Sequence, residues 1–117
     1  MTDTTTTTSD LLVSPAIAAA AVERGARFID VRSDGFRART GGLPQAEIIA
    51  KDRLDEAFAD AADTRPVVVI CGSINGSGPV ADQLVAKGFA NVVHVDGGFA
   101  AWKDAGLLTT PATDPDA

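Results

Sequence analysis

The only cysteine of the chain, Cys71, stands between an apolar run and a run of small residues. Residues 67–70 are all Val or Ile, and such a run is typical of a strand buried on both faces of a parallel sheet. The segment that follows predicts a loop at the carboxyl end of this strand; it consists of Gly72, Ser73, Ile74, Asn75, Gly76 and Ser77. A thiol at this place can act as a nucleophile in its thiolate form.

The loop after Cys71 offers a way to stabilise that thiolate. In open α/β sheets, ligands bind beyond the carboxyl ends of the strands, where backbone N–H groups and helix N-termini point outward. Loop amides curled around the sulfur, with the positive end of a following helix behind them, favour the anion. The opposite interpretation is a cysteine that only fills the core, because free cysteines are among the most buried residues. The residues of this segment alone leave both interpretations open.

Residue types and spacing argue against three other kinds of site: a nucleotide-binding loop, a cysteine-dependent phosphatase and a structural zinc site. The glycines after Cys71 do not follow the dinucleotide pattern G-x-G-x-x-G, and no lysine is present for a nucleotide-binding loop. A cysteine-dependent phosphatase needs an arginine six positions after its nucleophile, where this chain has Ser77. One cysteine and one histidine, His94, are too few for a structural zinc site, so we expect neither a metal nor a cofactor.

Composition limits the partners. The chain has 117 residues, 45% of them hydrophobic, and a formal net charge of −6, which fits one domain with one modest core. Binding to nucleic acid or to an anionic membrane is not expected, because a basic surface is needed for both. No apolar run reaches the roughly 18 residues that cross a bilayer. We expect a cytoplasmic protein, since the single cysteine cannot form an internal disulfide.

The chain divides into a lead, one domain and a tail. Residues 1–10 are Thr-rich without apolar periodicity and predict a disordered lead, while residues 109–117 predict a flexible tail. Between them, residues 11–108 alternate helical and strand patterns, which indicates an α/β domain whose mainly parallel central sheet is covered by helices on both faces.

Each element of this domain is expected from its apolar spacing and its capping residues. Strands are predicted at 27–31, 46–50, 67–70 and 92–95. One helix is predicted at 15–24, with Ser14 as its N-cap and Pro15 at its first position. Others are predicted at 51–62, from Ser77 or Gly78 to Gly88 with Pro79 in the first turn, and at 97–105.

Five segments together resemble, in order, the marker segments of single-domain rhodaneses. They are Phe28-Ile29-Asp30-Val31-Arg32, Gly41-Gly42-Leu43-Pro44-Gln45-Ala46, the Cys71 loop, Gly88-Phe89-Ala90-Asn91-Val92, and Asp96-Gly97-Gly98-Phe99-Ala100-Ala101-Trp102. The resemblance implies the rhodanese fold and a sulfurtransferase. In such an enzyme Cys71 would take a sulfane sulfur from a small donor, hold it as a persulfide among the loop residues 72–77, and pass it to cyanide, a thiol or a protein.

The loop after Cys71 departs from the family pattern at two positions. Family loops often read Cys-x-x-Gly-x-Arg-Ser, whereas Ile74 replaces the glycine and Gly76 the arginine. Without this arginine, a dianion such as thiosulfate loses a cationic contact, which favours a 3-mercaptopyruvate-like donor or a persulfide. The identity of the donor stays open between the thiosulfate class, the 3-mercaptopyruvate class and persulfides. It also leaves a second hypothesis, a non-enzymatic rhodanese-like module that binds a partner or senses redox state.

The remaining marker residues are assigned structural roles. Asp30 and Arg32 lie two apart on one strand face, and in this family such a pair is mainly structural. Gly97, Gly98 and Trp102 belong to the C-terminal marker segment, where Trp102 is expected in the core. His94 is interpreted as an ordinary strand residue.

Overall fold

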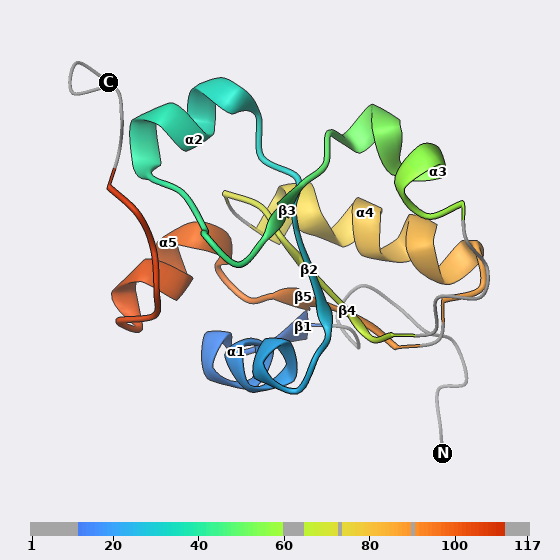
Figure 1. Ribbon diagram of the computed structural model, residues 1–117, viewed down its shortest axis with the longest axis horizontal. Helices are drawn as coiled ribbons and strands as arrows, with labels where there is room; N and C mark the ends of the chain where they lie inside the picture. Colours follow the sequence, from blue (N-terminus) through green and yellow to red (C-terminus); the bar gives the residue numbers. More distant parts are fainter. Residues whose placement is uncertain (1–11, 60–64, 73, 90, 112–117) are drawn as a thin grey trace.

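The apolar run Val67–Ile70 forms β4, the central strand of a five-stranded sheet, and its four side chains are buried. The computed structural model describes residues 12–59, 65–72, 74–89 and 91–111, with the backbone alone for residues 51 and 74–78. The other strands are β1 (Leu12–Val13), β2 (Arg27–Asp30), β3 (Glu47–Ile48) and β5 (Val92–Val95). Their order in the sheet is β1-β5-β4-β2-β3, and every neighbouring pair is parallel (Figure 1).

Helices cover both faces of the sheet (Figure 1). They are α1 (Pro15–Glu23), α2 (Asp34–Thr40), α3 (Leu54–Ala57), α4 (Ile74–Ala86) and α5 (Gly98–Asp104). Val68 and Ile70 of β4 pack in one core cluster with side chains of α1 and α5, whereas Val67 and Val69 pack in another with α3 and α4. Because successive side chains of a strand point to opposite faces, a continuous apolar run fills both clusters. The predicted α/β fold with a parallel sheet covered on both faces is confirmed.

Several elements match their sequence signals closely. β4 and β5 have the predicted bounds, and α1 begins at Pro15. The Ser14 side chain accepts a hydrogen bond from the backbone N–H of Ile17, as predicted for an N-cap. The strands predicted at 27–31 and 46–50 are shorter, at 27–30 and 47–48.

Two predicted helix boundaries are wrong. α4 begins at Ile74 rather than at Ser77 or Gly78, so Pro79 lies inside the helix. The fixed φ of proline suits a helix, and the cost is the missing N–H that would have bonded to the carbonyl of Asn75. The helix predicted from residue 51 is a 3₁₀ turn (Lys51–Arg53) followed by α3, which ends at Ala57; residues 60–62 lie outside the described chain.

The segment predicted as a tail starts in contact with the domain. Thr110 forms an isolated antiparallel bridge with Gly42: the N–H of Gly42 donates to the Thr110 carbonyl at 3.1 Å, and the N–H of Thr110 donates to the Gly42 carbonyl at 2.9 Å. The flexibility of the segment from residue 109 stays a prediction. Residues 1–10 and 112–117, also predicted to be disordered or flexible, lie outside the described chain.

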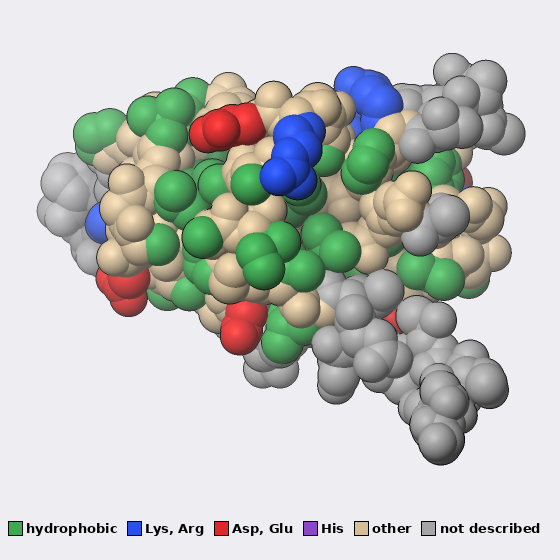
Figure 2. All heavy atoms as spheres, turned by 90° about the horizontal axis from the view of Figure 1, so that it is seen from below, with side chains coloured by type: hydrophobic (Ala, Val, Ile, Leu, Met, Phe, Trp, Pro, Cys, Tyr) green, Lys and Arg blue, Asp and Glu red, His purple; other side chains and the backbone are tan. Residues whose placement is uncertain are grey.

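The face that carries α1 shows many hydrophobic side chains among polar ones (Figure 2). α1 is rich in alanine, whose small side chain cannot cover the sheet beneath it, and a shallow apolar groove remains there. Its lining includes Ile17 of α1, Val13 of β1 and Val93 of β5. Within the described ranges, no helix combines the length and the apolar character that crossing a membrane requires.

Candidate active site

Cys71 lies at the carboxyl edge of the sheet, directly after the last residue of β4. It is a free cysteine and is half-buried. β2 and β4 end in register, with Asp30 opposite Ile70, and the N–H of Val31 donates to the Ile70 carbonyl at 3.1 Å. This register brings the segment that leads into α2 beside the thiol. α4 begins at Ile74, three residues after Cys71.

The first turn of α5 holds the backbone of Cys71 from one side. The N–H of Phe99 donates to the Cys71 carbonyl at 2.7 Å. Gly98 has φ +62°, and a Cβ built on it would lie 2.5 Å from the Cys71 carbonyl oxygen and 2.8 Å from the carbonyl carbon of Gly72. Only glycine suits this place, because a side chain would overlap the backbone of Cys71 and Gly72. The approach of α5 thus fixes the peptide that carries the thiol.

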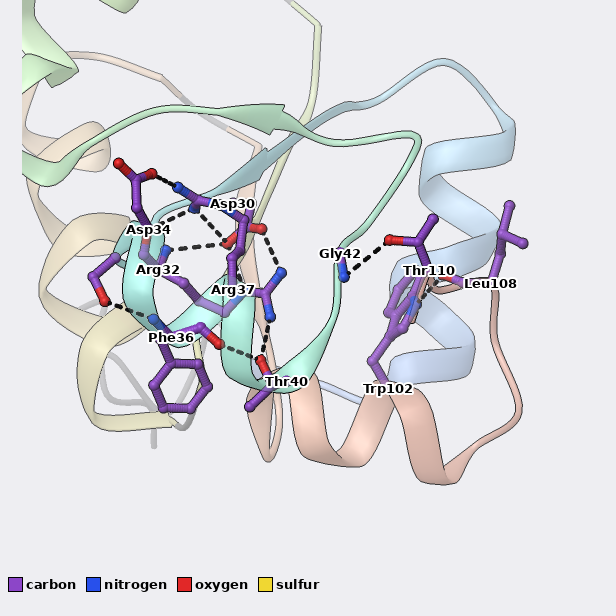
Figure 3. A network of polar contacts seen from close by, with 11 residues as sticks. Asp30, Arg32, Asp34, Phe36, Arg37, Thr40, Gly42, Trp102, Leu108 and Thr110 are labelled. Carbon is purple, nitrogen blue, oxygen red and sulfur yellow. Dashed lines mark hydrogen bonds and ion pairs between the residues drawn. The ribbon is translucent and has the colours of Figure 1, made fainter. Parts of the chain in front are cut away.

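A ring from α2 touches the same segment. A Cβ on Gly72 would lie 2.4 Å from Cζ of Phe36, so the edge of the ring rests on the Gly72 backbone. Phe36 points away from the polar contacts that hold α2 in place (Figure 3). The residue after Cys71 is therefore bordered by α2 as well as by α5.

A buried ion pair connects the two helices. The Arg32 guanidinium donates to the Asp30 carboxylate through Nε at 2.9 Å and Nη2 at 2.7 Å, and both side chains are almost fully buried. The guanidinium also lies over the Phe99 ring, 4.1 Å from its centroid, and donates to Oγ1 of Thr40 at 3.0 Å. The pair joins β2 to α2 through Thr40 (Figure 3) and reaches α5 through the Phe99 ring, which are contacts that a structural role requires.

The remaining contacts of α2 are local. Ser33 caps the helix by accepting from the N–H of Phe36 at 3.2 Å, and the Thr40 hydroxyl donates to the Phe36 carbonyl at 2.7 Å. Arg37 donates to the Arg32 carbonyl at 2.7 Å and forms an ion pair with Asp34. These contacts hold the turn that presents Phe36 to Gly72.

The C-terminal marker residues have structural positions. Gly97 is the N-cap of α5 with φ +79°, and Gly98 makes the close approach described above. Trp102 is buried as predicted, with its ring centroid 4.9 Å from that of Phe28. Its indole N–H donates to the Leu108 carbonyl at 3.1 Å, which ties the end of α5 to the segment that follows (Figure 3).

A family model described as "Rhodanese-like domain" matches residues 14–105. The chain belongs to the rhodanese-like family. The resemblance read from the marker segments is thereby confirmed.

Relatives and solved structures agree with this family. Thiosulfate sulfurtransferase GlpE of Pseudomonas savastanoi pv. phaseolicola is 34% identical over 91 residues, covering 78% of this chain and 85% of that protein. The GlpE of Pseudomonas fluorescens SBW25 is 35% identical over 92 residues, covering 78% and 83%.

Two solved structures share the fold. The rhodanese-like domain of an Anabaena protein superposes with a TM-score of 0.74 at 21% identity, over 92% of this chain and 83% of that chain. A thiosulfate sulfurtransferase from Pseudomonas aeruginosa gives a TM-score of 0.73 at 25% identity, over 87% of this chain and 19% of that one. The rhodanese-like fold is therefore shown.

The rhodanese loop predicted after Cys71 is largely helical. Gly72 is described and touches Phe36, Ser73 lies outside the described chain, and Ile74, Asn75, Gly76 and Ser77 form the start of α4. The first N–H groups of a helix have no partner within it, so these residues can still direct donors toward a ligand at the helix end. Their role in substrate binding stays a prediction.

The sequence analysis did not single out α2 or its side chains. The sequence did contain signals for this helix: Ser33 as an N-cap, Asp34 in the first turn and Gly41 after the last turn. In the structure Gly41 has φ +115°. Phe36 and Arg39 belong to this helix. His94, interpreted as a strand residue, lies fully buried in β5. Within the described chain, no group of three metal-ligating side chains comes together.

Proposed function

We propose that this rhodanese-like chain is a sulfurtransferase in which Cys71 carries the transferred sulfur as a persulfide. Family membership and relatives named thiosulfate sulfurtransferases support sulfur transfer in general. The observation that carries the finer proposal is the position of the only thiol, half-buried at the end of β4 and three residues before the start of α4.

The transfer has two steps. The Cys71 thiolate attacks the outer sulfur of thiosulfate, the S–S bond of the donor breaks, and sulfite leaves with the bonding electron pair. Cyanide then attacks the terminal sulfur of the Cys71 persulfide, thiocyanate leaves, and the thiolate is regenerated. A thiol or a protein sulfur acceptor takes the place of cyanide in the same step.

Backbone donors supply the charge stabilisation in this proposal. Both the thiolate and the persulfide are anions, and the first N–H groups of α4 have no partner inside the helix. The first turn of α4 contains no acidic residue that would oppose an anion. α5 and Phe36 hold the neighbouring peptides in place, so little rearrangement is needed when the sulfur arrives.

Donor, acceptor and location follow from the same proposal. The names of the relatives make thiosulfate the first donor to examine, followed by 3-mercaptopyruvate and glutathione persulfide. The acceptors are cyanide, a thiol or a protein thiol, with no nucleic acid and no membrane. A lone reactive thiol works best in a reducing compartment, which supports the cytoplasm as its location.

Intact-mass measurement after incubation with each donor tests the proposal. The wild-type protein should gain the mass of one sulfur atom, lose it on addition of cyanide, and release thiocyanate. The matched control, Cys71→Ser, removes the only thiol and should show neither the adduct nor the product. If none of the three donors adds sulfur to the folded wild-type protein, the enzyme proposal is wrong and a binding or redox-sensing module takes its place.

A further inference from the structure

α2 borders the site beside Gly72. The edge of the Phe36 ring rests on Gly72, the residue next to the thiol, as the overlap of a Gly72 Cβ with Cζ of Phe36 shows. Thr40 accepts from the Arg32 guanidinium and donates to the Phe36 carbonyl, so the turn that carries the ring is tied to the Asp30–Arg32 pair (Figure 3). A donor that reaches Cys71 therefore meets side chains of α2.

One of these side chains is a cation. The guanidinium carbon of Arg39 lies 6.0 Å from the centroid of the Phe36 ring, and Arg39 is exposed to solvent. Its Nη1 lies 3.6 Å from the place of a Cβ on Gly35, so the side chain runs back along the helix toward the ring. The positive charge thus lies beside the ring that borders Gly72.

The neighbouring arginines are already occupied, whereas Arg39 is not. Arg32 is buried against Asp30. Arg37 pairs with Asp34, lies 3.9 Å from the Asp30 carboxylate, and donates to a backbone carbonyl. With the described acidic residues, Arg39 makes no ion pair, and its one recorded partner is the Phe36 ring. Its charge is available to a ligand.

The site needs a cation that the segment after Cys71 does not contain. Residues 72–78 include no Lys or Arg, and the whole chain carries a formal net charge of −6, which repels an anion. The donors considered above are anions. An arginine offers planar, bidentate donors that suit a sulfonate or a carboxylate.

We propose that Arg39 is a specificity-determining residue that binds the sulfonate or carboxylate group of the sulfur donor beside the Phe36 ring, and so selects such donors over donors that lack this group. The inference rests on the proposed sulfur transfer at Cys71. Arg39 acts only while donor sulfur is being delivered, because sulfite has left before the acceptor attacks the persulfide.

Measuring the two half-reactions separately distinguishes donor binding by Arg39 from a structural role of this residue. In a double-displacement mechanism, kcat/KM for the donor and kcat/KM for cyanide report independent steps, and a structural defect lowers both. Arg39→Ala should lower kcat/KM for thiosulfate roughly five- to tenfold, the scale of one partly exposed charge-assisted contact. The values for cyanide and for 2-hydroxyethyl persulfide, a donor without a sulfonate or carboxylate group, should change by less than about twofold.

Matched variants complete the experiment. Arg39→Lys should recover part of the thiosulfate activity, because it keeps the charge and loses the planar donors. Arg24→Ala changes the net charge equally, at an exposed residue just after α1, and should leave all three values within about twofold. Raising the ionic strength should reduce the difference between wild-type and Arg39→Ala.

Each contrary result has a separate meaning. Equal losses for thiosulfate, cyanide and 2-hydroxyethyl persulfide, no loss at all, or a loss as large in Arg24→Ala would overturn the role of Arg39. In all of these cases the Cys71 persulfide still forms, and the proposed function stands. If no donor gives the persulfide in intact-mass measurements, the proposed function fails and this inference fails with it.

Discussion

Replacing Gly98 by alanine tests how closely α5 must approach the peptide that carries Cys71. The new Cβ meets two costs. Gly98 has φ +62°, and this left-handed conformation costs an L residue about 1–2 kcal/mol. The Cβ would also lie 2.5 Å from the Cys71 carbonyl oxygen, and because this neighbour is backbone it cannot rotate away, which adds about 1–3 kcal/mol of overpacking. We expect the free energy of unfolding to fall by about 2–5 kcal/mol.

Gly106→Ala is the matched control. Gly106 also has a positive φ, +78°, but a Cβ there would have no atom within 4 Å. Its substitution should cost the backbone strain alone, about 1–2 kcal/mol. The difference between the two variants therefore isolates the contact of α5 with the Cys71–Gly72 peptide.

Urea unfolding followed by tryptophan fluorescence measures both variants. Trp102 is the only tryptophan, is buried, and lies on α5 itself, so its emission reports on the affected helix. Equal m-values would show that the midpoints can be compared directly. A Gly98→Ala protein no less stable than Gly106→Ala would refute the argument that α5 packs against the backbone of Cys71 and Gly72.

Three further predictions concern the surroundings of the thiol. Asp30→Asn leaves Arg32 buried without its counter-charge and should reduce the free energy of unfolding by about 3–5 kcal/mol in urea titrations; a loss below about 1 kcal/mol would show that the pair is solvated. Gly72→Ala should cost about 1–3 kcal/mol in the wild-type and clearly less in a Phe36→Ala background, and additive costs would contradict the ring contact. Asn75→Pro removes one N–H from the first turn of α4, where proline is tolerated, and should slow sulfur transfer about tenfold or more relative to Asn75→Ala; equal rates would argue against backbone donors.

Elements whose signal is continuous and local could be predicted from the sequence. β4 and β5 are runs dominated by valine, and their bounds agree with the structure. α1 begins where a serine cap and a proline at the first helical position place it. The position of Cys71 at the end of β4 follows from the same run, whereas its catalytic role stays a prediction.

Contacts between distant segments could not be predicted in this way. β1 has only two residues, too few for a period, and it exists because it pairs with β5. α2 is seven residues long, and the contact of Phe36 with Gly72 joins positions far apart in the chain. For α4 the proline signal misled, because Pro79 suggested a start at Ser77 or Gly78, whereas the helix begins three or four residues earlier, at Ile74.

The all-parallel sheet has a consequence for how the chain folds as it is synthesised. An antiparallel hairpin can close as soon as its turn is made, but each parallel pairing must wait for a connecting segment. β2 can pair first with β3 and later with β4. β1, the first strand to be made, has no partner until β5, where Leu12 pairs with His94 and Val13 with Val95. A ribosome stalled before Val92 therefore holds a nascent chain in which β4 has an open edge and β1 has no partner, a species prone to aggregation. The last strand to be made completes the sheet.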